Sequence, residues 1–334
     1  MTRTTRHNAA PTLTAQSGYL IGVASRAPSV HNTQPWRFRV GEDAIELYAD
    51  TARQLTVDPD GREMLISCGA ALFGLRLAVR SLGCLAEVDL LPGGSVLARV
   101  RPGLPSAMTA EERSMLKAML RRHTHRGPFE PVPLPAGLLA GLQDDARAEG
   151  TELVVVDSAA GRRELAVITR VAGRRQDSDS RSRAEVYRWS HDAASPARDG
   201  VPAHAFPATP SRRPGQLPQR DFDLGRGFGL ITAGGPAAPV TAVLATSGDG
   251  PRDWLQAGQA LHRLLLHAAS QWVFASLNSQ PLEEPGARSV IGGFLTQPAS
   301  PQMLLELGVS RVTHATARRP PAGLTRTTEP RSGT

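Results

Sequence analysis

Ala27-Pro-Ser-Val-His-Asn-Thr-Gln-Pro-Trp36 is the segment around which this chain can be organised. A predicted helix over residues 14–26 ends before Pro28, and Pro35-Trp36 opens a predicted strand. Between them, short polar side chains stand on a turn where no helix satisfies their hydrogen bonds. Such a turn suits the polar edge of a planar heterocycle, but Asn and Ser are also ordinary turn formers. The segment is therefore either a binding turn or simply a well-made connection.

A second polar segment, Arg121-Arg-His-Thr-His-Arg-Gly-Pro-Phe129, follows a predicted helix over residues 109–120 that opens with a capping box. Three arginines in this segment offer planar forks that pair bidentately with phosphate, and Thr124 can add a hydroxyl. His123 and His125 are a close histidine pair two residues apart, and we do not expect this pair to bind a shared metal. The alternative interpretation of the arginines is a solvated basic surface.

Alternating α and β patterns surround both segments. Apolar residues three and four apart predict an amphipathic helix from an N-cap at Asp60 to about Leu82. Gly41-Glu42-Asp43 predicts a hairpin turn between strands over 36–40 and 44–49. Further strands are expected over 86–91, 96–100, 151–156, 228–232, 240–246 and 303–309, and further helices over 134–148, 160–192 and 253–272. The stretch 195–226 is rich in Pro, Arg, Gly and Asp, which indicates a long loop or lid.

A weak internal repeat relates two parts of the chain. When the chain is shifted by 189 residues, positions 69–92 match positions 258–281 at eight of 24 places, including Gly69 with Gly258. Either the chain contains two copies of one α+β unit, or two Ala/Leu-rich helices coincide by composition.

The charge of the chain is unevenly distributed. The formal net charge is +7, which suggests a nucleic-acid partner when it is taken as a sum. Residues 1–12 carry +2 and residues 311–334 carry +4, so residues 13–310 carry only +1. A nearly neutral body argues against nucleic-acid binding.

The remaining composition indicates a cytoplasmic protein. The first residues lack the apolar core of a secretory signal, and no run of about 18 apolar residues predicts a membrane span. Cys68 and Cys84 form no CxxC pair and no disulfide framework, and both read as small hydrophobic residues in or beside an apolar helix pattern. No metal site is predicted.

The two polar segments together resemble a known family. APSVHNTQPW is similar to the A-P-S-x-x-N-x-Q-P-W signature of the FMN-dependent nitroreductase superfamily, and RRHTHRGPF to its R-R/H-S/T-x-R/K-x-F signature. The reversed order of the two, about 90 residues apart, resembles single-chain Acg-type nitroreductases. The resemblance implies an α+β, nitroreductase-like fold: two fused halves that form an intrachain pseudo-dimer, with mainly antiparallel mixed sheets flanked by helices. The halves would span 13–105 and 106–320, with a lid-like insert over 195–226 and flexible tails over 1–12 and 321–334.

The same resemblance assigns a cofactor site. The residues that would bind FMN are Arg122, His123, Thr124 and Arg126 from one half, Pro28, Ser29, Asn32 and Gln34 from the other, and the C-terminal pair Arg318 and Arg319. Arg122 and the C-terminal pair would contact the phosphate. Arg126 would approach the ribityl chain and the N1/C2=O side of the ring, where a cation stabilises the negative charge of reduced flavin.

The activity implied is NAD(P)H-dependent reduction of a small electron acceptor, such as a nitroaromatic or a quinone, by a ping-pong mechanism. No protein residue is expected to be catalytic, because N5 of the flavin would carry the hydride. The expected partners exclude nucleic acid and membrane, and the protein would be a monomeric pseudo-dimer or a homodimer. The alternative is a non-catalytic protein that binds or sequesters flavin, or has lost FMN. It rests on the long insert and on Trp272 and Glu306, which depart from the family pattern.

Overall fold

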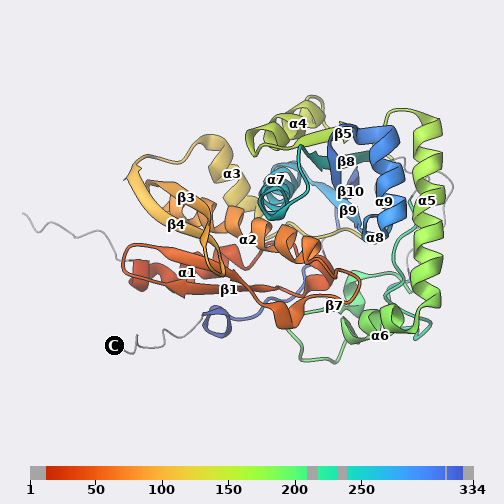
Figure 1. Ribbon diagram of the computed structural model, residues 1–334, viewed down its shortest axis with the longest axis horizontal. Helices are drawn as coiled ribbons and strands as arrows, with labels where there is room; N and C mark the ends of the chain where they lie inside the picture. The colour runs from red at the N-terminus through yellow and green to blue at the C-terminus, as the bar shows by residue number, and fades with distance from the viewer. Residues whose placement is uncertain (1–12, 209–216, 232–238, 313, 326–334) are drawn as a thin grey trace, which may run out of the picture.

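Two four-stranded sheets lie on either side of a pair of crossing central helices, α2 and α7, in the computed structural model (Figure 1). The structure describes residues 13–208, 217–231, 239–312 and 314–325. The predicted tail over 1–12, part of the predicted insert over 195–226 and the end of the predicted C-terminal tail therefore lie outside the described residues.

In the first half, one helix precedes the four strands in the chain, and one long helix stands between the second and third strands. Its elements are α1 (Leu13–Ala24), η1 (Val30–Asn32), β1 (Trp36–Val40), β2 (Ile45–Ala49), η2 (Thr51–Arg53), α2 (Arg62–Ser81), β3 (Cys84–Gly93) and β4 (Val96–Pro105). The strands pair in the order β1-β2-β4-β3, and every pairing is antiparallel. The predicted hairpin over 36–49 is confirmed.

The second half repeats this arrangement with longer connections. Its elements are α3 (Ala110–Ala118), α4 (Leu138–Ala148), β5 (Glu152–Val155), α5 (Ala159–Ser178), α6 (Ser180–Arg188), β6 (Ser190–His191), β7 (Val201–Pro202), η3 (Ala203–Ala205), β8 (Val240–Thr246), α7 (Pro251–Ser270), β9 (Val273–Asn278), α8 (Gln280–Glu283), α9 (Pro285–Ile291), η4 (Gly292–Thr296) and β10 (Ser300–Val309). A final short turn of helix, η5 (Pro321–Leu324), returns to the first half. The second sheet is again antiparallel, in the order β5-β8-β10-β9.

Both sheets therefore place their strands in the order first, second, fourth, third, with the long helix between the second and third strands. The halves differ in their connections. A short turn over residues 41–44 joins β1 to β2, whereas residues 156–239 separate β5 from β8. The predicted α+β fold is confirmed, and the shared strand order of the two sheets agrees with two related halves.

The crossing of α2 and α7 is reciprocal. A Cβ added at Gly69 would stand 2.2 Å from the carbonyl oxygen of Leu255, and one added at Gly258 would stand 2.0 Å from that of Ile66. Both pairs of positions, 69 with 258 and 66 with 255, are separated by the 189-residue offset of the sequence repeat. Reciprocal contacts of this kind are those expected across a two-fold axis. The glycines are required because any side chain would force the two backbones apart.

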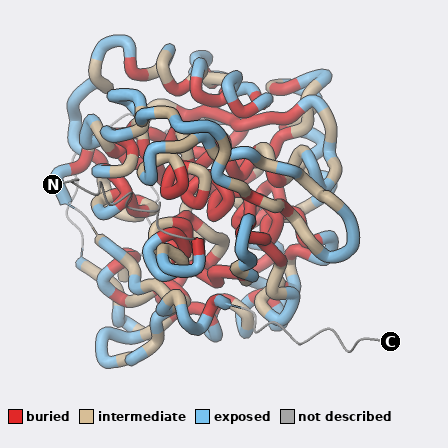
Figure 2. Tube along the Cα trace, turned by 90° about the vertical axis from the view of Figure 1, so that its left-hand side faces the viewer, coloured by how far each residue is buried: buried red, intermediate tan, exposed pale blue. Residues whose placement is uncertain are grey.

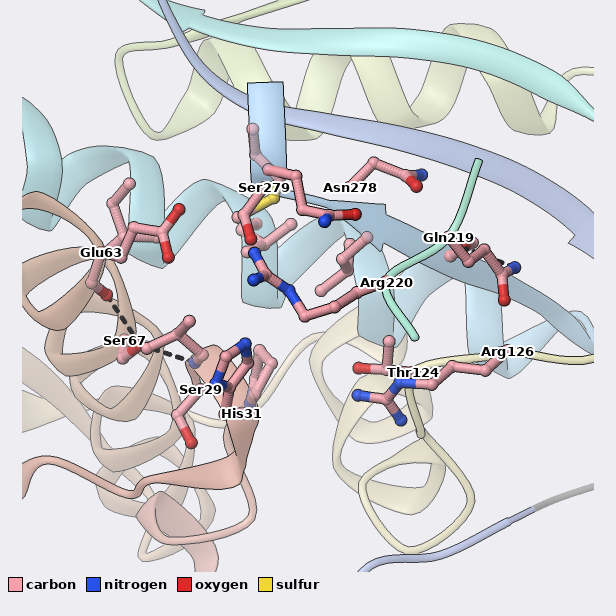
Figure 3. Close-up of a pocket in the computed structure, with 18 of the residues that line it drawn as sticks. Ser29, His31, Glu63, Ser67, Thr124, Arg126, Gln219, Arg220, Asn278 and Ser279 are labelled. Atoms are coloured by element: carbon pink, nitrogen blue, oxygen red, sulfur yellow. Dashed lines mark hydrogen bonds between the residues drawn. The ribbon is translucent and has the colours of Figure 1, made fainter. Parts of the chain in front are cut away.

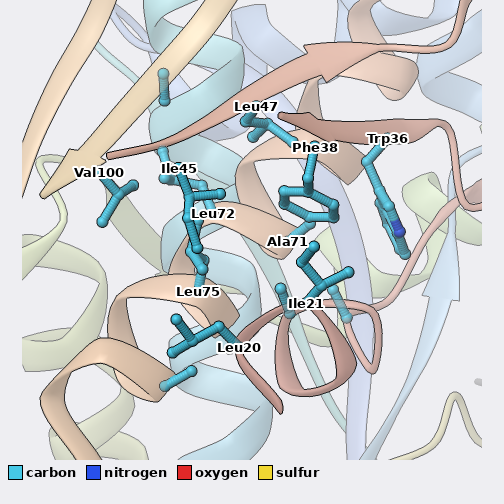
Figure 4. Packing of buried hydrophobic residues seen from close by; sticks show 14 of the residues in the cluster. Leu20, Ile21, Trp36, Phe38, Ile45, Leu47, Ala71, Leu72, Leu75 and Val100 are labelled. Carbon is cyan, nitrogen blue, oxygen red and sulfur yellow. The ribbon is translucent and has the colours of Figure 1, made fainter. Parts of the chain in front are cut away.

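In β1, side chains alternate between the buried core and the outer face of the sheet. In β1, Trp36 and Phe38 are buried against α2, while Arg37 and Arg39 face outward. Leu20 of α1 and Leu72 of α2 complete this cluster (Figure 4). Buried residues concentrate in the middle of the molecule (Figure 2). The α2 helix is long and apolar enough to cross a membrane, but 78% of its most apolar window is buried inside the protein, as expected of a core helix.

Three predicted helix boundaries are wrong. The carboxylate of Asp58, not Asp60, caps α2 by accepting the N–H groups of Glu63 and Met64. The predicted helix over 160–192 is two helices, because the extended backbone of Asp179 ends α5 and its side chain caps α6. The helix predicted to continue to Trp272 ends at Ser270.

The strand predicted over 228–232 does not form in its described part. The Asp223 carboxylate accepts the N–H groups of Gly227, Phe228 and Gly229, so these groups do not join a ladder, and Leu230 forms one isolated bridge with Pro207. Thr232 lies outside the described residues.

Two further differences concern segments that the sequence patterns misplaced. Strand β9 was not predicted, because its apolar residues follow the apolar pattern of α7 almost without a break. The left-handed backbone of Trp272 (φ 60°) makes the turn between them. The expected C-terminal tail begins later than residue 321, because η5 contacts α1 and β1 and buries Leu324.

Candidate functional site

A polar cavity lies where the first turn of α2, the turn over 28–31, the end of β9 and the insert meet (Figure 3). Its volume is about 80 Å³. It is lined by Pro28, Ser29, Val30, His31, Glu63, Ile66, Ser67, Thr124, Arg126, Gln219, Arg220, Phe222, Leu261, Ser276, Leu277, Asn278, Ser279, Gln280 and Met303. Each half contributes residues, so neither half contains the complete site.

Several buried polar atoms of the lining have no hydrogen-bond partner. They are both ring nitrogens of His31, Oε2 of Glu63, Oε1 of Gln219 and Nδ2 of Asn278. Buried polar groups in folded proteins are normally paired, so a concentration of unpaired ones around one cavity marks a place that a polar ligand or ordered water would occupy.

The predicted binding turn is strained. His31, Asn32 and Gln34 have φ angles of 45°, 54° and 51°, in the left-handed region that side chains rarely adopt. The Ser29 hydroxyl accepts the Gln34 N–H at 3.0 Å and braces the turn. Strain of this kind persists where the surrounding structure enforces it, often at binding sites. The strain and the cavity favour a binding turn over an ordinary connection.

A cluster of arginines lies at the other end of this turn. Arg122 Nη2 donates to the carbonyl oxygen of Arg26 at 3.1 Å, and Arg318 Nη2 donates to that of Ala27 at 3.2 Å. Arg122 Nε and Nη1 and Arg318 Nε are buried without a partner. Among the described residues, no carboxylate forms an ion pair with either guanidinium.

The charges of this cluster are poorly compensated. Burial and the neighbouring Arg126 lower the pKa of Arg122 to about 10, and burial with Arg122 and Arg26 lowers the pKa of Arg318 to about 9. Both shifts indicate guanidinium groups that have lost water without gaining an anion. A phosphate would supply the missing acceptors and the missing charge. This is the observation on which the assignment of an anion site depends.

Arg126 connects the arginine cluster to the cavity. Its guanidinium lies 5.1 Å from the centre of the Phe222 ring, and burial lowers its pKa to about 10. Thr124 also lines the cavity, and its segment is held on β9 because the His125 N–H donates to the carbonyl oxygen of Ala275 at 2.8 Å.

His123 does not line the cavity. Its ring lies 4.4 Å from that of Phe274, its Nδ1 is 3.1 Å from the carbonyl oxygen of Arg121, and burial lowers its pKa to about 3. Because neighbouring residues of an extended segment face opposite ways, Thr124 faces the cavity and His123 the core.

Asn32 and Gln34 bind backbone rather than the cavity. Asn32 Nδ2 donates to the carbonyl oxygen of Gly200 at 2.9 Å, and Gln34 Nε2 donates to that of Arg198 at 2.8 Å. The Gln34 side chain also accepts the Arg319 N–H at 2.8 Å. These two residues therefore attach the base of the insert and the C-terminal segment to the turn.

The two C-terminal arginines separate. Arg318 joins Arg122, whereas Arg319 Nη1 lies 3.3 Å from the carbonyl oxygen of Gln34 and 3.9 Å from the Asp50 carboxylate. The structure thus brings Arg318 into the anion cluster and leaves Arg319 outside it.

The insert covers the cavity. Arg220 forms a buried ion pair with Glu283 at 2.6 Å, and the Phe222 ring lies edge-on to His31 at 5.3 Å. The Leu217 N–H donates to the buried carboxyl of Glu306 at 3.0 Å. Arg220 and Phe222 of the insert line the cavity, whose volume of about 80 Å³ holds a few water molecules.

Sequence reasoning missed His31, Glu63 and Asn278 as site residues. An acid inside the otherwise apolar α2 pattern was a possible signal for Glu63. Asn278 gave none, because β9 itself was not predicted.

A separate group, Glu111, Asp145 and His267, places one ligand atom from each residue within 4.8 Å of the others. Asp145 is already held by Arg263 Nε at 2.7 Å and His267 Nδ1 at 2.6 Å. Arg263 supplies the positive charge there, so the group is an ion-pair network that joins α3, α4 and α7.

The fold and the site define a two-half α+β protein with an anion cluster and a polar cavity shared between the halves. No family model matches the chain. It is 33% identical over 304 residues to "Putative NAD(P)H nitroreductase Rv3131" of Mycobacterium tuberculosis, which covers 86% of this chain and 83% of that protein. It is 28% identical over 308 residues to "Putative NAD(P)H nitroreductase acg" of the same organism, covering 90% and 92%. The chain belongs to the nitroreductase superfamily, in the single-chain group of these proteins.

Solved structures with weaker likeness have also been found. A nitroreductase with bound FMN from Desulfitobacterium hafniense DCB-2 aligns with a TM-score of 0.41 and 15% identity over 66% of this chain and 100% of its own. A nitroreductase structure from Anabaena variabilis aligns with a TM-score of 0.46 and 12% identity, over 80% and 69%.

Proposed function

We propose that this protein binds FMN and uses NAD(P)H to reduce a small electron acceptor, such as a nitroaromatic or a quinone. The observation that carries the proposal is the pair Arg122 and Arg318, whose buried N–H groups lack both acceptors and a counter-charge. The strained turn and the polar cavity beside this pair supply places for a planar ring. The names of the relatives, NAD(P)H nitroreductases, support the same activity.

The residues present fit such a cofactor. Arg122 and Arg318 would bind the phosphate through their unpaired N–H groups, and Pro28, Ser29, Thr124 and Arg126 would contact the ring system from both halves. The Arg126 cation, which has no acid partner among the described residues, would stabilise negative charge on the ring side of the site. When bound, FMN would accept a hydride from NAD(P)H and transfer it to the acceptor.

The protein's other partners are part of the proposal. A nearly neutral body gives no basic surface for nucleic acid, and the buried position of α2 gives no reason to invoke a membrane. Both cysteines are free, which suits a reducing cytoplasm. Because both halves of the site lie in one chain, a monomer is sufficient, and a homodimer is also compatible.

Absorption spectroscopy tests the proposal directly. Purified protein titrated with FMN should acquire a flavin spectrum, and anaerobic NADPH should bleach it. Riboflavin, which lacks the phosphate, should bind at least about tenfold more weakly, since charge-assisted hydrogen bonds contribute roughly 1.5–3 kcal/mol each. Protein that binds neither flavin, or binds both equally, would contradict the phosphate assignment.

A second candidate is a protein that binds or sequesters flavin without turning over. The observation that favours it is the insert, because Arg220 and Phe222 line the cavity and leave it a volume of only about 80 Å³. In that case the FMN complex would form but neither NADPH nor a quinone would change its spectrum. Bleaching by NADPH followed by reoxidation with a quinone would exclude this candidate.

A further inference from the structure

Glu63 occupies an unusual position for a carboxyl group. It lies in the first turn of α2, lines the cavity and is 2% exposed. Arg62 Nη2 donates to its Oε1 at 3.1 Å, whereas Oε2 is buried and has no partner. Its carboxyl projects from α2 toward Arg220, across the cavity (Figure 3). One oxygen of the carboxyl group therefore accepts a hydrogen bond from Arg62, and the other has no partner at the cavity.

The surroundings of Glu63 favour its protonated form. Burial contributes most, and the neighbouring acids Glu283 and Asp58 add to it, while Arg62 and Arg220 oppose it. The result is a pKa well above the ordinary carboxyl value of 4.5. Because Oε1 accepts a hydrogen bond from Arg62, the proton belongs on Oε2.

We propose that Glu63 donates the proton that completes reduction of the electron acceptor, a role that rests on the proposed function. Converting a quinone to a hydroquinone requires one hydride and one proton. The proposed NAD(P)H and FMN supply the hydride. The O–H bond of Glu63 Oε2 breaks, its proton joins an oxygen of the acceptor, and the bonding electron pair stays on the carboxylate beside Arg62. Water then returns a proton to Glu63.

Other described groups of the cavity are poorer donors. His31 is kept neutral, because burial together with Arg220 and Arg126 lowers its pKa well below the usual value. The Asn278 amide and the serine hydroxyls are not acidic at neutral pH. Guanidinium groups retain their protons. Among the described lining residues, Glu63 is thus the group best able to release a proton near neutral pH.

Infrared difference spectroscopy on the protein without cofactor tests where this proton resides. The difference between the wild type and Glu63→Gln at neutral pH should contain the carbonyl band of a protonated carboxyl, and this band should disappear only well above pH 4.5. A carboxylate band in that difference at neutral pH would overturn the proposal.

Folding stability provides a second readout without cofactor. A proton held by native Glu63 but released by the unfolded chain makes stability fall as the pH rises from 4.5 to the raised pKa. Glu63→Gln should reduce this fall. An unchanged pH dependence would contradict the proposed protonation.

Rapid-mixing kinetics on FMN-loaded protein test the transfer itself. Glu63→Gln should keep FMN affinity and the rate of reaction with NADPH within about twofold, but slow reoxidation by a quinone about 100-fold or more. The wild-type reoxidation rate should fall at high pH, and the variant should lose this dependence. A purely structural role would leave the pH profile in place, and that result would overturn the proposal.

Glu306→Gln is the matched control. Glu306 is also 2% exposed and has a pKa raised by burial to about 7, but it lies outside the cavity lining and accepts the Leu217 N–H. This variant should retain the wild-type pH dependence of reoxidation, and loss of that dependence would count against Glu63. If the wild type binds no FMN, the proposed function fails, whereas the infrared result still reports the proton on Glu63.

Discussion

The two ends of the site differ in how their buried charges are balanced. At one end, Arg122 and Arg318 bring two guanidinium groups together without an acid among the described residues. At the other, Arg220, which lines the cavity, forms a buried ion pair with Glu283 at 2.6 Å. The first end lacks an anion that a ligand can supply, and the second is complete within the protein. The comparison suggests that the arginine end binds, while the acidic end closes the cavity and holds a proton.

The largest effect is expected from breaking the balanced end. Glu283→Gln leaves the buried Arg220 cation without its partner, and removal of one member of a buried pair typically costs about 3–5 kcal/mol. Urea unfolding of the protein without cofactor measures this loss. Asp144→Asn removes a comparable contact to Arg147 at an exposed site and should change stability by less than about 1 kcal/mol. Equal effects of the two variants would remove the distinction between a balanced and an unbalanced end.

A substitution at the arginine end should weaken FMN binding but should cost little folding stability. Arg122→Ala removes a buried charge that lacks a counter-ion, so the protein without cofactor should lose little stability. FMN affinity should nevertheless fall about 100-fold, because up to two charge-assisted hydrogen bonds to the phosphate are lost. Fluorescence titration with FMN and thermal unfolding provide the two measurements. Full FMN affinity in this variant would refute the anion site.

Substitutions of Arg318 and Arg319 test which of these two neighbours belongs to the anion cluster. Arg318→Ala should weaken FMN binding about tenfold, since Arg318 carries one unpaired buried Nε toward the cluster. Arg319→Ala should change it less than about threefold, because Arg319 contacts Asp50 and Gln34 instead. The resemblance had placed both on the phosphate. Comparable losses in the two variants would restore that assignment and contradict the geometry.

Sequence patterns predicted correctly those elements that depend on interactions between residues close together in the chain. The β1–β2 hairpin, the α2 helix and the capping box of α3 follow from periodicity and turn chemistry, and all three formed. The pattern predicted one buried face for α2, whereas the structure buries the helix on all its faces. Errors arose where one side chain or one backbone angle overrode the hydrophobic pattern. Asp223 takes the N–H groups that the strand predicted over 228–232 would have used, and the left-handed backbone of Trp272 starts a strand that no turn residue announced.

The candidate site shows the same division. Pro28, Ser29, Thr124 and Arg126, four of the residues assigned through the two signatures, line the cavity, and Arg122 lies near Arg318. His123 faces the core, and Asn32 and Gln34 attach the insert. A signature identifies a segment, but which side of an extended chain faces the cavity depends on the strand beneath it.

By itself, the sequence determined the family, most of the helices and strands and the two polar segments, because these depend on residue order and short-range spacing. The tertiary structure alone decided that Gly69 and Gly258 let α2 and α7 cross reciprocally, so that both polar segments reach one cavity. It also decided that Arg318 and Arg319 separate, and that Glu63 faces the cavity with one free oxygen. Burial and charge compensation arise from residues far apart in the chain, so no local pattern can specify them.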